Sequence, residues 1–73
     1  MRNMEVARVF YEIGDLLEIK NENPFKVKAY KKAAQVIEAL PEDIEQVYKD
    51  GRLRNVPGVG ASIAEKIEEY FST

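Results

Sequence analysis

Three prolines, Pro24, Pro41 and Pro57, divide this 73-residue chain into segments whose apolar residues recur at helical spacing. In the first segment the apolar residues step by three or four positions, as on one face of a helix: Val6, Val9, Phe10, Ile13 and Leu17. Gly14 interrupts this segment at a cost of about 1 kcal/mol relative to alanine, which indicates that another helix approaches there. No segment is a convincing strand. The pattern predicts an all-α fold, a compact bundle of four to five short helices.

Local signals set the expected ends of the later helices. Asn23 is a suitable N-cap and Pro24 suits a first helical position, which predicts a second helix over Pro24–Ala39. Its inward face is expected to contain Val27, Tyr30, Ala33, Ala34 and Ile37. Pro41 is expected to open a short helix that ends at Gly51, and the RLRNV stretch after it to form another helical turn. The last helix is expected over Ala61–Ser72, with Ile63, Ile67, Tyr70 and Phe71 on its buried face.

Composition narrows the class of protein. With 45% apolar and 33% charged residues, the chain reads as a single folded domain over residues 1–73, expected to be monomeric. It contains no cysteine and no histidine, which removes disulfides, thiol chemistry and the usual zinc sites and favours an intracellular origin. No apolar run approaches the roughly 18 residues of a membrane span, so a membrane is not an expected partner.

The positive charges are concentrated although the net charge is −2. The stretch KVKAYKK places Lys26, Lys28, Lys31 and Lys32 together without one acidic residue between them, and Arg54 lies near a later glycine turn. Such a local basic face can neutralise a few phosphates on a mildly acidic domain. The alternative is that these lysines form the solvated face of an amphipathic helix.

The stretch VPGVG, residues 56–60, is expected to be a tight hairpin between two helices. Pro57 presets one backbone angle, while Gly58 and Gly60 permit positive φ and close approach by another molecule. The helix that follows begins with unbonded N–H groups beside these glycines, an arrangement that suits a phosphate oxygen. The alternative is a connection that only joins two packed helices.

Two stretches carry a family resemblance that covers nearly the entire chain, from Val6 to Phe71. RLRNVPGVGASIAEKIEEYF resembles a helix-hairpin-helix motif. Together with NPFKVKAYKKAAQVIEALPEDI, it resembles the N-terminal lyase domain of family X DNA polymerases, the polymerase beta group, in its bacterial or archaeal form. The resemblance implies docking on single-stranded or gapped DNA at a 5′-phosphate. It also implies 5′-deoxyribose-phosphate lyase activity, by Schiff-base β-elimination, in base excision repair.

The same resemblance implies roles for individual residues. Lys66 corresponds to the Schiff-base lysine and Tyr30 to a tyrosine of the lyase pocket, while Glu65 is a candidate proton shuttle. DNA and 5′-phosphate contacts are implied or expected for Phe25, Lys26, Lys28, Lys31, Lys32, Arg54, Gly58, Gly60 and Ser62. No cofactor is required, but the family's hairpin holds a monovalent cation, Na⁺ or K⁺, through backbone carbonyls that correspond to those of Arg54, Val56 and Val59. The expected location is the cytoplasm, at the nucleoid, in a prokaryote and the nucleus in a eukaryote.

Two positions depart from the family pattern. Ser62 stands where the polymerase beta group has a lysine, so phosphate affinity is expected to be lower and lyase activity is left open. Phe25 stands where that group has a base-stacking histidine. An aromatic ring can stack on any base, a contact worth about 1–3 kcal/mol. Phe25 could equally be part of the core.

Each candidate also has a structural interpretation. A lysine attacks a carbonyl only when neutral, so partial burial of Lys66 between apolar neighbours would favour catalysis. Glu69, three residues on, instead offers Lys66 an ordinary surface ion pair. Tyr30 either packs in the core or aims its hydroxyl at a pocket, and Glu65 is either a shuttle or solvated.

Three functions are therefore compared. The first is a polymerase domain with lyase activity, the second a helix-hairpin-helix DNA-binding module without catalysis, and the third a helical protein-interaction module. The chain has only three aspartates, Asp15, Asp43 and Asp50, dispersed over different segments, so no nucleotidyl-transfer triad is recognisable and polymerase activity is not expected. The family normally continues into further polymerase domains, which would be partners if this chain is an excised domain.

Overall fold

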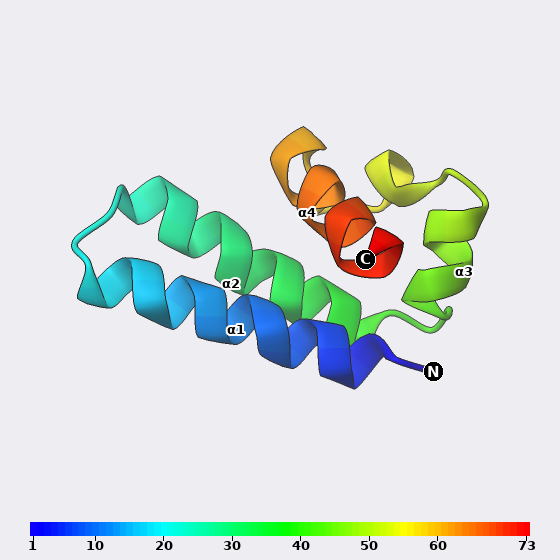
Figure 1. The fold of residues 1–73 in the computed structure, drawn as a ribbon, viewed down its shortest axis with the longest axis horizontal. Coiled ribbons are helices and arrows are strands. Elements are labelled where there is room, and N and C mark those ends of the chain that lie inside the picture. Colours follow the sequence, from blue (N-terminus) through cyan, green and yellow to red (C-terminus); the bar gives the residue numbers. More distant parts are fainter.

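The computed structural model describes residues 1–73 and contains helices only. Its elements are α1 (Asn3–Ile19), α2 (Pro24–Ala39), α3 (Ile44–Lys49), the 3₁₀ turn η1 (Leu53–Asn55) and α4 (Ala61–Ser72). Helices α1 and α2 lie side by side as a long antiparallel pair (Figure 1). The elements from α3 to α4 lie toward the end of that pair where α1 begins and α2 ends, away from the loop that joins the two helices. The predicted all-α fold is confirmed.

Capping residues place the ends of α2 and α3. The side chain of Asn23 accepts a hydrogen bond from the backbone N–H of Phe25 at 2.9 Å, as an N-cap does. The prediction that Pro41 opens the third helix is wrong. That helix begins at Ile44, because the Asp43 side chain accepts from the N–H of Glu45 at 3.1 Å and caps it there.

Gly51 ends α3 as the sequence predicts. Its φ of 70° is in the left-handed region. The N–H of Gly51 donates to the carbonyl of Tyr48 at 3.0 Å, and the N–H of Arg52 donates to the carbonyl of Val47 at 3.0 Å. This pair of bonds is a Schellman motif, in which glycine supplies the backbone conformation that other residues rarely adopt.

One apolar core joins all the helices. Its fully buried large side chains come from every α-helix: Val6, Phe10, Ile37, Ile44, Val47 and Ile67. Three residues of the predicted α1 stripe, Val9, Ile13 and Leu17, are only half-buried, because they border a cavity. The expected close approach at Gly14 is confirmed, since a Cβ there would lie 2.9 Å from Cγ of Lys31 on α2.

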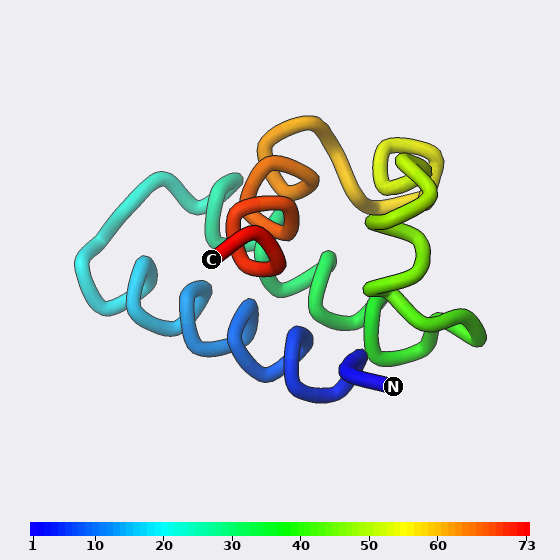
Figure 2. Tube along the Cα trace, turned by 45° about the vertical axis from the view of Figure 1, so that its right-hand side comes forward, coloured from blue at the N-terminus to red at the C-terminus, as the bar shows by residue number.

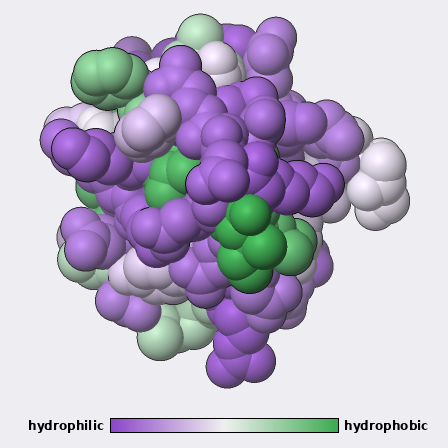
Figure 3. Space-filling model, turned by 90° about the vertical axis from the view of Figure 1, so that its left-hand side faces the viewer, coloured by the Kyte–Doolittle hydropathy of each residue, from purple (hydrophilic) through white to green (hydrophobic).

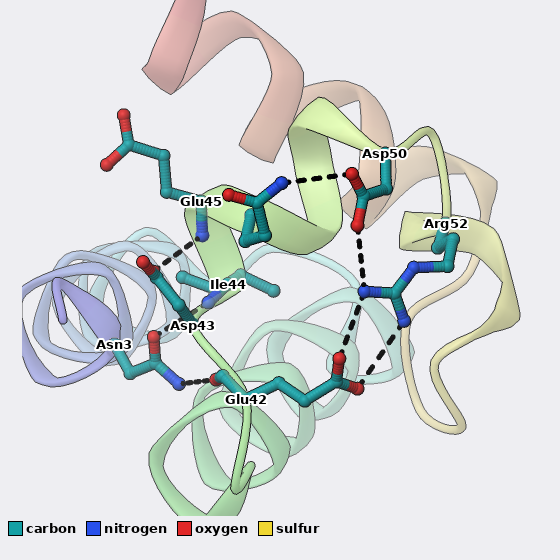
Figure 4. A network of polar contacts seen from close by, with 8 residues as sticks. Asn3, Glu42, Asp43, Ile44, Glu45, Asp50 and Arg52 are labelled. Atoms are coloured by element: carbon teal, nitrogen blue, oxygen red, sulfur yellow. Dashed lines mark hydrogen bonds and ion pairs between the residues drawn. The ribbon is translucent and has the colours of Figure 1, made fainter.

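The buried amide of Asn3 fixes the start of α1 to the loop between α2 and α3 (Figure 4). Its Nδ2 donates to the carbonyl of Glu42 at 2.6 Å and to that of Ile37 at 3.4 Å. Its Oδ1 accepts the backbone N–H of Ile44 at 2.8 Å. The side chain therefore pairs the Glu42 carbonyl and the Ile44 N–H, which have no backbone partner.

The last turn of α4 lies near α1 (Figure 2), and its side chains contact residues at the start of α1. The Tyr70 hydroxyl donates to the carboxylate of Glu5, which also pairs with Arg2 at 2.8 Å. The Arg2 guanidinium lies 5.3 Å from the ring centre of Phe71, within the range of a cation–π contact. These contacts fix α4 across the α1–α2 pair, which sets the position of every α4 side chain described below.

Candidate nucleic-acid interface

The hairpin between η1 and α4 is a tight turn over residues 56–59. The N–H of Val59 donates to the carbonyl of Val56 at 3.0 Å. Pro57 occupies the second position of the turn, and Gly58 occupies the third with a φ of 91°. A turn with proline second and positive φ third requires glycine at that third position.

The two hairpin glycines have different surroundings. A Cβ on Gly58 would lie 2.7 Å from Cγ2 of Val36. The close approach at this glycine is therefore made by α2 of the same chain. Gly60 has φ −81° and ψ −179°, and nothing lies within 4 Å of the position its Cβ would take. Only Gly60 therefore leaves open space for another molecule to approach the backbone.

Gly60 is also the N-cap of α4. Its carbonyl accepts the N–H of Ala64 at 2.9 Å, and no side chain caps the helix start. The backbone N–H groups of Gly60, Ala61 and Ser62 make no hydrogen bond within the chain, and all three residues are exposed. Unbonded donors at a helix N-terminus attract an anion because the helix dipole adds to their charge.

The lysines of α2 divide into paired and unpaired cations. Lys31 forms ion pairs with α1, with its Nζ 3.2 Å from Oδ1 of Asp15 and 3.1 Å from Oε1 of Glu18. Lys26, Lys28 and Lys32 have no carboxylate within 4.0 Å.

Two cations lie near the hairpin. Cε of Lys32 is 3.8 Å from the position of a Cβ on Gly58, so this unpaired lysine lies beside the turn. Arg54, in η1, is exposed and approaches Glu68 at 3.5 Å.

A cavity of about 480 Å³ lies between α1, α2 and α4. Its walls are Val9, Phe10, Ile13, Leu17, Lys26, Tyr30, Lys66, Glu69, Tyr70 and Thr73. Three of the residues that the sequence singled out, Lys26, Tyr30 and Lys66, therefore line one cavity. Tyr30 is buried and its ring centre lies 5.8 Å from that of Phe10, so it both packs in the core and borders the cavity.

Lys66 has both of the environments that the sequence analysis considered, a partly buried position and an ion pair with Glu69. Its side chain lines the cavity, yet half of it is exposed, and its Nζ lies 3.7 Å from Oε2 of Glu69. Glu65, the predicted proton shuttle, is exposed and does not line the cavity. Ser62, Lys66, Glu69 and Thr73 follow one another at steps of four, three and four, so they form one stripe along α4.

Phe25 lies outside the core, with 80% of its surface exposed, which removes the core interpretation left open by the sequence. It belongs to the first turn of α2, near the end of the molecule where α1 and α2 are joined. Figure 3 looks onto that end, where apolar side chains reach the surface as separate green areas in a mostly hydrophilic face. An exposed aromatic ring beside Lys26 is available for stacking.

Of the three carbonyls that correspond to the family's cation site, one accepts a hydrogen bond within the chain. That of Val56 accepts the N–H of Val59, whereas the carbonyls of Arg54 and Val59 accept no hydrogen bond from the chain. Two unbonded carbonyls and one with a remaining lone pair are the hard oxygen donors that an alkali cation takes.

Glu69, Tyr70 and Thr73 line the cavity but were not among the predicted site residues. The spacing from Lys66 could have identified Glu69 and Thr73, which stand three and seven positions further along the same helix. Val36, which packs under the hairpin, carried no sequence signal of that role.

Comparison with known proteins agrees with this geometry. A family model described as a helix-hairpin-helix domain matches residues 1–73. The DNA polymerase/3′-5′ exonuclease PolX of Bacillus subtilis (strain 168) is 31% identical over 71 residues, which cover 97% of this chain and 12% of that protein. None of the helices is both long and apolar enough to cross a membrane. The two helices joined by the Val56–Gly60 hairpin, and the match over all 73 residues, show that the chain belongs to the helix-hairpin-helix domain family.

Proposed function

We propose that this chain is a DNA-binding domain of a family X DNA polymerase, which docks at a 5′-phosphate on single-stranded or gapped DNA. The observation that carries the proposal is the hairpin: it presents the unbonded N–H groups of Gly60, Ala61 and Ser62, and the side chain of Lys32, which has no ion-pair partner, lies beside Gly58 of the same turn. Backbone donors at a helix start and one nearby cation make a phosphate site without sequence preference. The similarity to PolX supports the placement among polymerases.

The cavity supports a second part of the proposal, 5′-deoxyribose-phosphate lyase activity. Lys66 is the nucleophile that forms a Schiff base with the sugar aldehyde, and Lys26, which lines the same cavity from α2, holds the sugar phosphate. Phe25 offers a ring on which an unpaired base stacks. Na⁺ or K⁺ at the carbonyls of Arg54, Val56 and Val59 would fix the hairpin against the DNA backbone.

A non-catalytic DNA-binding module is the second candidate, and two observations favour it. Ser62 supplies no charge beside the hairpin, and the ammonium group of Lys66 faces the carboxylate of Glu69 at 3.7 Å. The Lys66 side chain must leave this ion pair before its nitrogen can attack a carbonyl.

The deciding experiment is borohydride trapping on an incised abasic duplex that carries a 5′-deoxyribose phosphate. Wild type is compared with Lys66→Ala and with Lys20→Ala, an exposed lysine at the end of α1. Binding of all three proteins to gapped DNA is measured in parallel by fluorescence anisotropy. We expect an adduct with wild type and Lys20→Ala and none with Lys66→Ala, at equal DNA affinity. If wild type binds DNA but forms no adduct, the non-catalytic DNA-binding module is the function that remains. If wild type does not bind DNA, both the lyase domain and the DNA-binding module are excluded.

A further inference from the structure

Glu69 is the only acidic side chain among the residues that line the cavity. Its Oε2 lies 3.7 Å from Nζ of Lys66, and its carboxylate makes no other ion pair or hydrogen bond. It projects from α4 one turn beyond Lys66, on the face that closes the cavity against α1. Glu69 is therefore the acidic side chain that a sugar bound to Lys66 would meet.

We propose that Glu69 is the general base of the elimination step, the group that removes the C2′ proton of the sugar once it is bound to Lys66. This inference rests on the proposed lyase function. In the imine, C2′ is bonded to C1′, and C1′ is bonded to Nζ, so C2′ lies about 2.5 Å from that nitrogen. A carboxylate oxygen now 3.7 Å from Nζ can therefore reach the hydrogen on C2′ without movement of the helix.

The step balances as follows. Neutral Nζ of Lys66 attacks the C1′ aldehyde, and loss of water with uptake of one proton from the solvent leaves a protonated imine. Glu69 takes the C2′ proton, and the electrons of that C–H bond form an enamine with C1′. The enamine then re-forms the imine, a C2′=C3′ double bond forms, and the C3′–O bond breaks with its electron pair on the departing phosphate. Water hydrolyses the unsaturated imine and releases the lysine, and no oxidant or reductant is needed.

The other polar groups of the cavity are unsuited to this role. Lys26 is an ammonium group with no acceptor atom. The hydroxyl of Tyr70 is bonded to Glu5 and that of Thr73 to the backbone carbonyl of Glu69. Tyr30 is buried against Phe10 and carries a phenol rather than a carboxylate.

The test separates formation of the imine from its elimination. Glu69→Gln is compared with wild type and with Glu12→Gln, which makes the same change in charge at an exposed position of α1 outside the cavity. Each protein is assayed on the 5′-deoxyribose-phosphate duplex in two ways: adduct trapped with borohydride, and single-turnover release of the sugar phosphate without borohydride. We expect Glu69→Gln to form the adduct at least as fast as wild type but to release the sugar phosphate about 100-fold more slowly. Glu12→Gln should match wild type in both assays.

Two results would overturn the assignment while the lyase function stands. If trapping and release change by the same factor in Glu69→Gln, the residue acts only as the counter-ion of Lys66. If neither changes, Glu69 takes no part in the reaction. A wild type that forms no adduct at all would instead remove the proposed function itself, and the general base with it.

Discussion

Gly58 of the hairpin packs against Val36 of α2 so closely that a Cβ would lie 2.7 Å from Cγ2 of the valine. The contact joins the hairpin to the lysine-bearing helix, because Lys32 stands one turn before Val36 and its Cε lies near the same glycine. The hairpin that leads into α4 and the side chain of Lys32 therefore hold a fixed position relative to each other. Glycine at position 58 serves the turn and this packing at once.

Replacement of Gly58 by alanine is expected to destabilise the protein by about 2–4 kcal/mol, because the φ of 91° is strained for alanine and the added methyl group meets Val36. The matched control is Gly60→Ala, whose φ is −81° and whose Cβ would meet nothing within 4 Å. That change should cost less than about 1 kcal/mol. Urea unfolding followed by circular dichroism measures both, and equal losses would contradict the role given to Val36.

Lys32 and Lys31 are neighbours in the sequence with opposite expected effects on DNA affinity. Lys32→Ala should weaken binding to gapped DNA several-fold and reduce the slope of log K against log salt by about 0.7–0.9, the value of one lost phosphate contact. Lys31→Ala should leave both nearly unchanged, because its ammonium group is held by Asp15 and Glu18. Anisotropy titrations at several salt concentrations test the pair. A loss with Lys31→Ala as large as with Lys32→Ala would show that charge alone, without position, determines affinity.

Asn3→Ala should destabilise the fold by about 2–4 kcal/mol. The change leaves the buried N–H of Ile44 and the carbonyl of Glu42 without their partner, and unpaired buried polar groups cost about 1–3 kcal/mol each. Asn55→Ala is the control, since that side chain is exposed and makes no hydrogen bond. Chemical denaturation compares the two. A loss with Asn3→Ala no greater than with Asn55→Ala would mean that water replaces the amide.

Glu5 should make the stability depend on pH. The hydrogen bonds from Arg2 and then Tyr70 hold the pKa of this carboxyl below its ordinary value of 4.5, so its contribution is present above that value and is lost as the pH falls through the lowered pKa. The bond to Glu5 also raises the pKa of Tyr70 above 10, so the contribution of the phenol is lost as the pH rises through that raised pKa.

The urea midpoints of wild type and Glu5→Gln should therefore differ most between about pH 6 and pH 9, and the difference should shrink towards pH 3 and above pH 10. Glu12→Gln, on the same helix and without an ion pair, provides the comparison. A difference between wild type and Glu5→Gln that stays constant from pH 3 to pH 7 would show that the Glu5 contacts do not form in solution.

Most of the local structure could be predicted from the sequence, because it depends on neighbours along the chain. The bounds of α2 follow from Asn23 and Pro24, and the end of α3 follows from Gly51. The start of α3 could not be placed as well, since Pro41 and Asp43 both signal a helix start and only the Asp43 side chain forms the cap. The apolar stripe of α1 predicted which residues face inward, but not that part of this face borders a cavity.

The sequence by itself determined the helices, the hairpin and the residue types of the candidate site, since spacing, capping and turn chemistry act over a few residues. The tertiary structure decided which of those residues can act together. It brought Lys26 and Lys66 to one cavity, tied Lys31 to carboxylates of α1, and placed Glu69 rather than Glu65 beside the cavity. The physical reason is that the charge environment and the exposure of a side chain depend on the helices packed against it. Those helices come from distant parts of the chain and meet only when the core forms.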